Sequence, residues 1–140
     1  MWIEFLRVFI AAILGAIVGL EREFHHKPAG LRTNILICMG AAVFTILSKE
    51  ISAGTNDSLA RIAAQIVTGV GFIGAGAIIQ DRGGIHGLTT AASIWLVSSI
   101  GMACGAGKYE LAIFTTFCAI FVLIVIAKLR KPLRHDPNKE

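Results

Sequence analysis

The amino-acid sequence predicts an all-α, polytopic membrane protein, a bundle of five transmembrane helices with a central glycine-rich helix. Of its 140 residues, 55% are hydrophobic and 16% are charged, and the mean hydropathy is +0.73. Such a composition is typical of chains that cross a membrane several times. The charged residues also divide the chain into uncharged stretches, and each stretch is long enough to form a helix through the hydrocarbon core of a bilayer.

The central stretch runs from Ile62 to Gln80, between Arg61 at its predicted outer boundary and Asp81 at its inner one. Its nineteen uncharged residues would span about 28 Å as a helix at roughly 1.5 Å per residue, close to the roughly 30 Å thickness of the hydrocarbon core. We therefore expect a membrane-spanning helix here.

The glycines of this stretch predict close helix packing. Glycine costs about 1 kcal/mol relative to alanine in a water-exposed helix, but it is common where membrane helices touch, because it lets their backbones approach. Small residues fall on two sides of the helix at about 100° per residue, so we expect neighbours on both sides. The expected packing residues are Gly69, Gly71, Gly74 and Gly76. The first three also have dinucleotide-loop spacing, but no strand is predicted before them, so helix packing is favoured.

Four further spans are expected, at Met1–Leu20, Thr33–Ser48, Gly87–Gly105 and Leu111–Ala127. The first lacks the basic start of a signal peptide, because Glu4 precedes Arg7, and we expect it to stay in the protein. The fifth contains no glycine and is rich in phenylalanine, isoleucine and valine, which predicts a helix at the lipid-facing edge. These spans make one membrane domain over residues 1–127, followed by a short basic tail over residues 128–140.

Lysine and arginine predict the orientation, because loops on the cytoplasmic side carry an excess of both. Placing the N-terminus outside and the C-terminus in the cytoplasm puts nine of the thirteen basic residues inside. These nine are Arg22, Lys27, Arg32, Arg82, Lys128, Arg130, Lys131, Arg134 and Lys139. The net positive charge therefore indicates membrane orientation, and no nucleic-acid partner is expected.

Small and mildly polar residues form stripes along three spans. One stripe carries Ala11, Gly15 and Gly19; a second carries Asn34, Cys38, Ala41, Thr45 and Ser48; a third carries Thr90, Ser93, Val97, Gly101 and Cys104, with Thr89 beside it. Such stripes usually pack or hydrogen-bond helices together, and the second and third could alternatively line a narrow polar path. In the central helix, Gln65 is the corresponding polar residue within the membrane.

The connection from Glu21 to Arg32 concentrates charge on the cytoplasmic side. Glu21, Arg22, Lys27 and Arg32 are its functional candidates, and Asp81 would lie at the same surface. We therefore expect an ion-pair network between the two cytoplasmic loops. Two adjacent histidines also lie here, but a lysine follows them directly, which favours a solvated, ion-paired loop over a metal site.

The chemistry of catalysis is missing from the predicted spans. All nine carboxylates lie at span ends, in loops or in the tail, so no buried hard-cation site is expected at the bilayer centre. The sequence contains no phosphate-binding loop that would indicate an energy source. The sequence therefore predicts neither an enzyme nor an ATP-driven pump, and no metal or cofactor.

Several motifs occur in order along residues 14–109. They are Gly19-Leu-Glu-Arg-Glu, Lys27-Pro-Ala-Gly-Leu-Arg-Thr33, Arg61-Ile-Ala-Ala-Gln, Gly69-Val-Gly-Phe-Ile-Gly-Ala-Gly76 and Gly87-Leu-Thr-Thr-Ala-Ala92, followed by Trp95. They closely resemble the membrane domain of the MgtC/SapB family. The resemblance implies a five-span protein of the bacterial inner membrane, linked to magnesium homeostasis and to adaptation to low magnesium.

The recurrent polar positions of that family correspond here to Glu21, Arg22, Lys27, Arg32, Arg61, Gln65, Thr89 and Thr90. The chain departs from the family pattern in two places. Asp57-Ser-Leu-Ala-Arg61 replaces the usual Asp-Pro pair before the arginine, and residues 128–140 stand where many magnesium-linked members carry a cytoplasmic domain. A function that needs that domain is therefore not assumed.

Two classes of function remain open. The first is a regulator that transports nothing itself, binds another membrane protein and alters ion handling. The second is a small channel or carrier for magnesium or another small ion. The lack of buried carboxylates favours the regulator, and the resemblance keeps the carrier open. Besides the lipid bilayer, the expected partner is another membrane protein or a second copy of this chain.

Overall fold

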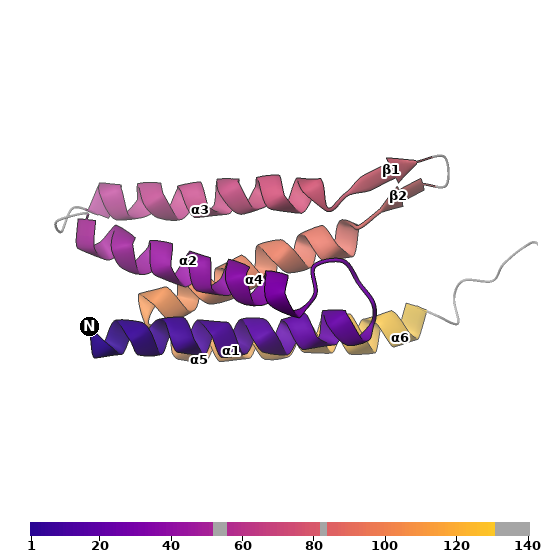
Figure 1. Ribbon diagram of the computed structural model, residues 1–140, viewed down its shortest axis with the longest axis horizontal. Helices are drawn as coiled ribbons and strands as arrows, with labels where there is room; N and C mark the ends of the chain where they lie inside the picture. Colours follow the sequence, from indigo (N-terminus) through magenta and orange to yellow (C-terminus); the bar gives the residue numbers. More distant parts are fainter. Residues whose placement is uncertain (52–55, 82–83, 131–140) are drawn as a thin grey trace, which may run out of the picture.

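The computed structural model describes residues 1–51, 56–81 and 84–130. Its long helices run alongside one another (Figure 1). The elements are α1 (Trp2–Phe24), α2 (Leu31–Ile51), α3 (Asn56–Gly76), β1 (Ile79–Asp81), β2 (Gly84–His86), α4 (Leu88–Ala106), α5 (Tyr109–Phe121), a π-helix (Val122–Ile126) and α6 (Ala127–Arg130). The N-terminus lies at one end of the bundle and α6 at the other. Most of the predicted basic tail, residues 131–140, falls outside the described residues.

Four described helices are long and apolar enough to cross a membrane. They are α1, α2, α4 and the continuous helix Tyr109–Ile126, formed by α5 and the π-helix. In α3 the apolar part is shorter, Ala63–Gly76. The predicted class, an all-α polytopic membrane protein, is confirmed.

The helix at the centre of the bundle is α4, whereas α3 lies at one edge. Half of the apolar window of α4 is buried, against 17% for the helix that begins with α5. Figure 1 shows α3 along one side, α1 and α5 along the other, and α2 and α4 between them. The low burial of the helix that begins with α5 agrees with its predicted place at the edge of the bundle. The predicted central place of the glycine-rich helix was wrong, because α3 packs mainly on α2 and α4 and leaves its other side open.

The glycine-rich helix also ends earlier than predicted, at Gly76 instead of Gln80. After a last turn, β1 and β2 pair antiparallel, with Ile79 opposite His86. Isoleucine favours extended backbone, and Gly87 begins α4 at a φ of 86°. A side chain at Gly87 would collide with the backbone carbonyl of the turn after α3. A small hairpin therefore replaces the last turn of the predicted span.

The closest helix contacts lie among α1, α2 and α4. A Cβ added at Gly15 of α1 would lie 2.8 Å from the backbone oxygen of Asn34 in α2. One added at Gly105 of α4 would lie 2.5 Å from the backbone oxygen of Ala42, and one at Gly101 would collide with a carbonyl of α2. Distances under 3.0 Å are essentially never seen for real Cβ atoms. These glycines therefore allow the backbones to touch, which confirms the packing role predicted for the small stripe of α1.

Candidate functional site

The connector between α1 and α2 is held by hydrogen bonds from both helices. His26 and Ala29 have positive φ angles, 50° and 58°, which turn the chain sharply. The carboxylate of Glu23 accepts a hydrogen bond of 2.9 Å from the backbone N–H of Leu31, and so satisfies one of the free N–H groups at the start of α2. The connector therefore has a defined shape at one end of the bundle.

Glu21 and Arg22 form a buried ion pair beneath this connector. Glu21 is 7% exposed and Arg22 is 4% exposed, and Arg22 Nε lies 2.7 Å from Glu21 Oε2. His25 Nδ1 lies 3.1 Å from the other oxygen, Glu21 Oε1. The sequence predicted a loop at both residues. In the structure α1 continues to Phe24, so Glu21 and Arg22 belong to its last turns. Buried charges require a partner, and here each is the partner of the other.

The remaining predicted cytoplasmic candidates are exposed. Lys27 lies in the connector and Arg32 in the first turn of α2, and both side chains are accessible. Asp81 lies in β1, where its carboxylate is 3.5 Å from the Nε2 of His86 in β2. Arg22 pairs with its own neighbour Glu21, so the ion-pair network between the two loops stays a prediction. Arg82 falls outside the described residues.

Asn34 ties the connector to α2. Its side chain is fully buried, and its Nδ2 donates hydrogen bonds to the backbone carbonyls of Ala29 and Gly30, the latter at 2.8 Å. Its Oδ1 is buried and has no hydrogen-bond partner among the residues that the structure describes. Gly19 of α1 makes room for it, because a Cβ at Gly19 would lie 3.2 Å from the Cβ of Asn34. The sequence placed Asn34 on a polar stripe, and only the structure assigns it this role.

The predicted polar stripes of α2 and α4 face other helices. Thr45 Oγ1 donates to the carbonyl of Ala41 at 2.7 Å, and Ser93 Oγ donates to the carbonyl of Thr90 at 2.8 Å. Thr90 and Ser93 are both buried. The hydroxyls of Thr45 and Ser93 are therefore satisfied within their own helices, as is common for threonine and serine in membrane helices.

Thr89 differs from its buried neighbour Thr90 because it is exposed. It lines a small cavity of about 210 Å³ between α1, α4 and the helix that begins with α5. Ser93 and Thr115 add hydroxyls to a wall that is otherwise mainly apolar.

The predicted residues of α3 do not form one site. A Cβ at Gly74 would lie 3.5 Å from the carbonyl oxygen of Ala91 in α4, an ordinary packing distance. Gln65 and Arg61 are exposed. The other three glycines, Gly69, Gly71 and Gly76, would meet nothing within 4 Å if they carried a Cβ.

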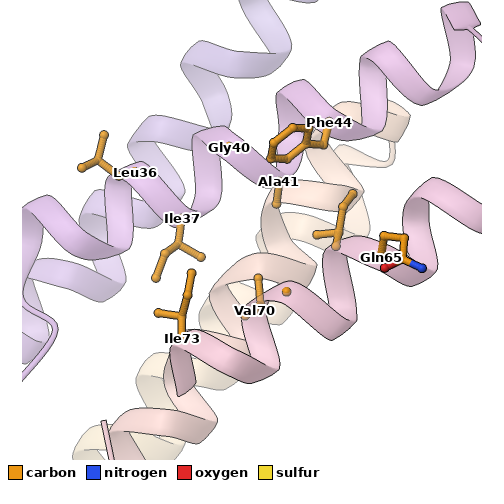
Figure 2. A pocket seen from close by; sticks show the side chains of 10 residues that line it. Leu36, Ile37, Gly40, Ala41, Phe44, Gln65, Val70 and Ile73 are labelled. Carbon is orange, nitrogen blue, oxygen red and sulfur yellow. The ribbon is translucent and has the colours of Figure 1, made fainter. Parts of the chain in front are cut away.

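A groove of about 590 Å³ separates α2 from α3 (Figure 2). Ile37 and Ile73 face each other across it, and Gln65 lies at the opposite end from this pair. Its walls are formed by Leu36, Ile37, Gly40, Ala41, Phe44, Gln65, Ile66, Gly69, Val70 and Ile73. Gln65 is the one residue of this lining with a polar side chain.

One polar contact within the bundle was missed by the sequence analysis. Arg7 Nη1 donates a hydrogen bond of 3.0 Å to the backbone oxygen of Gly105 at the end of α4. The positive guanidinium thereby satisfies a free carbonyl at the negative end of a helix. The signal was a lone arginine within the first apolar span, since such a charge needs a partner close by.

Metal-ligand residue types do not gather in the described part of the chain. No group of three or more histidine, cysteine, aspartate or glutamate side chains could hold a metal ion there. Cys38 and Cys104 are buried free thiols of α2 and α4. The arrangement offers buried helix contacts, one charged connector and one open apolar groove.

The comparison with known families identifies the kind of protein. The model of the MgtC family matches residues 8–131. This chain belongs to the MgtC family. The predicted resemblance is thereby confirmed over nearly the whole chain, together with the multi-pass membrane class.

Three MgtC-family relatives illustrate the similarity. The chain is 48% identical over 139 residues to YhiD of Escherichia coli strain K12, whose name describes it as a candidate magnesium transporter, with 92% of this chain and 63% of YhiD covered. It is 44% identical over 120 residues to the protein MgtC of Brucella abortus strain 2308, covering 86% and 48%. It is 40% identical over 132 residues to the protein MgtC of Salmonella typhimurium strain LT2, covering 94% and 56%.

The chain therefore spans between about half and just under two thirds of the length of these MgtC-family relatives. No solved structure matches it.

Proposed function

We propose that this MgtC-family chain is a non-enzymatic regulator in the bacterial inner membrane, with the N-terminus outside and the C-terminus in the cytoplasm. It contributes to magnesium homeostasis by binding another membrane protein and altering how that protein handles ions. The similarity to MgtC and YhiD proteins supports the link to magnesium. The mode of action is argued from the arrangement of polar side chains.

The observation that carries this proposal is the burial of the polar stripes. An ion path needs oxygen ligands that face a water-filled space. Instead, Thr45 and Ser93 donate to carbonyls of their own helices, and Asn34 bonds the connector. The groove between α2 and α3 and the small cavity beside α4 both have mainly apolar walls. The polar side chains of the single chain therefore favour a rigid scaffold over a path that conducts ions.

The surface proposed for binding is the connector between α1 and α2. His26, Lys27 and Arg32 are exposed there, so a partner with an acidic surface would be attracted. Hydrogen bonds of Glu23 and Asn34 hold the connector in a defined shape, which reduces the ordering cost of binding.

A small channel or carrier for magnesium or another small ion is the second candidate. One observation favours it: Thr89, Ser93 and Thr115 bring hydroxyls to the small cavity beside α4. Hydroxyl and carbonyl oxygens are ligands that magnesium accepts. In this alternative an oligomer would complete the path.

Purified protein in liposomes separates the two functions. The regulator predicts no flux of magnesium, protons or small anions above that of empty liposomes. It also predicts specific capture of a membrane protein from solubilised bacterial membranes, lost in a Lys27→Glu/Arg32→Glu variant. Lys108→Glu is the matched control, because Lys108 is exposed and immediately precedes α5, away from the connector. Flux that Ser93→Ala reduces without loss of folding would contradict the regulator and support the carrier.

A further inference from the structure

The outer side of α3 carries glycines that contact no other helix in the described part of the chain. Gly69 and Gly76 would meet nothing within 4 Å if each carried a Cβ. Between them Phe72 is 84% exposed. By contrast, Gly15 and Gly101 lie against backbone atoms of α2. The glycines of α3 therefore lack the close helix contact that glycines elsewhere in the bundle have.

Gln65 places an amide on this same side. It is exposed and has no hydrogen-bond partner among the described residues. An unsatisfied amide in hydrocarbon is unfavourable, and glutamine side chains in membrane helices hydrogen-bond across helix interfaces. Since an amide has both donors and an acceptor, two Gln65 side chains can satisfy each other.

Helical geometry puts these residues on one face. At about 100° per residue, Gln65, Gly69, Phe72 and Gly76 lie within an arc of roughly 60°. The face therefore carries one aromatic side chain with a glycine about one turn away on each side. A two-fold interface needs a surface that is complementary to itself, and this face has both the large side chain and the gaps that would receive it.

The groove between α2 and α3 adjoins this face. Gly69 and Gln65 belong both to the face and to the lining of the groove. Figure 2 shows the open space between α2 and α3 with Gln65 near its end. An aromatic side chain that lies over Gly69 would therefore reach the mouth of an apolar space of about 590 Å³.

We propose that two copies of this chain associate through α3 about a two-fold axis parallel to the membrane normal. Both copies insert in the same orientation, so Gln65 meets Gln65 of the second copy at the same depth. Phe72 of each copy lies over Gly69 of the other. The interface is independent of the binding surface at the connector, so this proposal does not rest on the proposed function.

The test is subunit counting by single-molecule photobleaching of fluorescently labelled protein in phospholipid vesicles, over a range of lipid-to-protein ratios. The wild-type protein is expected to show two bleaching steps at high protein density and one on dilution. Gly69→Leu is expected to give single steps throughout, because the added side chain fills the gap that receives Phe72.

Gly71→Leu is the matched control. Gly71 is also open on α3, but it lies about 200° from Gly69 around the helix axis, away from the proposed interface. Neither leucine would meet other atoms of the monomer near its Cβ, so both variants should fold. We expect Gly71→Leu to dimerise like the wild type.

Gln65→Leu tests the amide pair. Hydrogen bonds between membrane helices contribute modestly, so we expect the dissociation constant to rise by roughly threefold to thirtyfold. A wild-type protein that stays monomeric at every protein density in the vesicles would overturn the proposal, and lipid would then be the expected occupant of the groove. Loss of the dimer in Gly71→Leu with retention in Gly69→Leu would also overturn it, because the interface would then lie elsewhere.

Discussion

Replacement of Gly15 by alanine tests whether helix contact at glycine determines the stability of this bundle. The new Cβ would lie 2.8 Å from both the backbone oxygen of Asn34 and the Cβ of Cys38. Neither atom is the far end of a flexible side chain, so α1 and α2 must separate by a few tenths of an ångström. The separation loosens contacts along the whole interface, because packed interiors transmit strain.

The expected cost follows from overpacking in a close-packed core, which is typically about 1–3 kcal/mol. Alanine also favours the helix over glycine by about 1 kcal/mol in water, which would partly hide the effect. Gly71→Ala removes this ambiguity. It makes the same chemical change on a helix, but its Cβ would meet nothing within 4 Å. The difference between the two variants isolates the contact.

The measurement is the free energy of unfolding in mixed detergent micelles, titrated with a denaturing detergent. Gly15→Ala is expected to be less stable than Gly71→Ala by about 1–3 kcal/mol. Equal stabilities would refute the reasoning, because they would mean that α1 and α2 can separate at no cost. A Gly15→Leu variant should enlarge the effect, whereas Gly71→Leu should not.

Three further predictions use the same unfolding assay. Arg7→Leu removes the charged hydrogen bond to Gly105 and should cost about 1.5–3 kcal/mol; Arg7→Lys should recover part of this loss. Glu21→Leu leaves Arg22 buried without its carboxylate and should cost about 3–5 kcal/mol, whereas a cost near zero would contradict the buried pair. Asn34→Leu removes both bonds to the connector and should cost about 1–3 kcal/mol, with faster proteolysis between α1 and α2 as a second measurement.

The existence of the helices was predictable from the sequence because hydropathy and charge decide it. Uncharged stretches between charged residues must form helices in a bilayer, since every backbone N–H and C=O needs a partner there. Thus α1, α2, α4 and α5 appear where they were expected, with ends that differ by a few residues. The sequence predicted a loop at Glu21 and Arg22, because two charged residues after an apolar span usually mark its solvated end. The structure buries the pair in the last turns of α1.

The packing of the stripes was partly predictable. The expectation that Gly15 and Gly19 allow close approach was correct, since α2 lies against both. The alternative use of Thr45 and Ser93 along a path could not be decided from spacing alone. A hydroxyl that bonds its own helix and one that faces a path have the same sequence pattern. Only the direction of the side chain separates the two readings.

The position of α3 was not predictable because glycine marks a contact without saying which molecule provides the other half. Gly74 meets α4 of the same chain, whereas a Cβ at Gly69 or Gly76 would meet none of the described residues within 4 Å. Sequence reasoning assigned all these contacts to the one bundle and therefore placed α3 at its centre. If the proposed pair of copies forms, the expectation of neighbours on both sides of α3 is correct for the dimer and wrong for the monomer. The two variants Gly69→Leu and Gly71→Leu decide between a helix that faces lipid and a helix at the centre of a larger assembly.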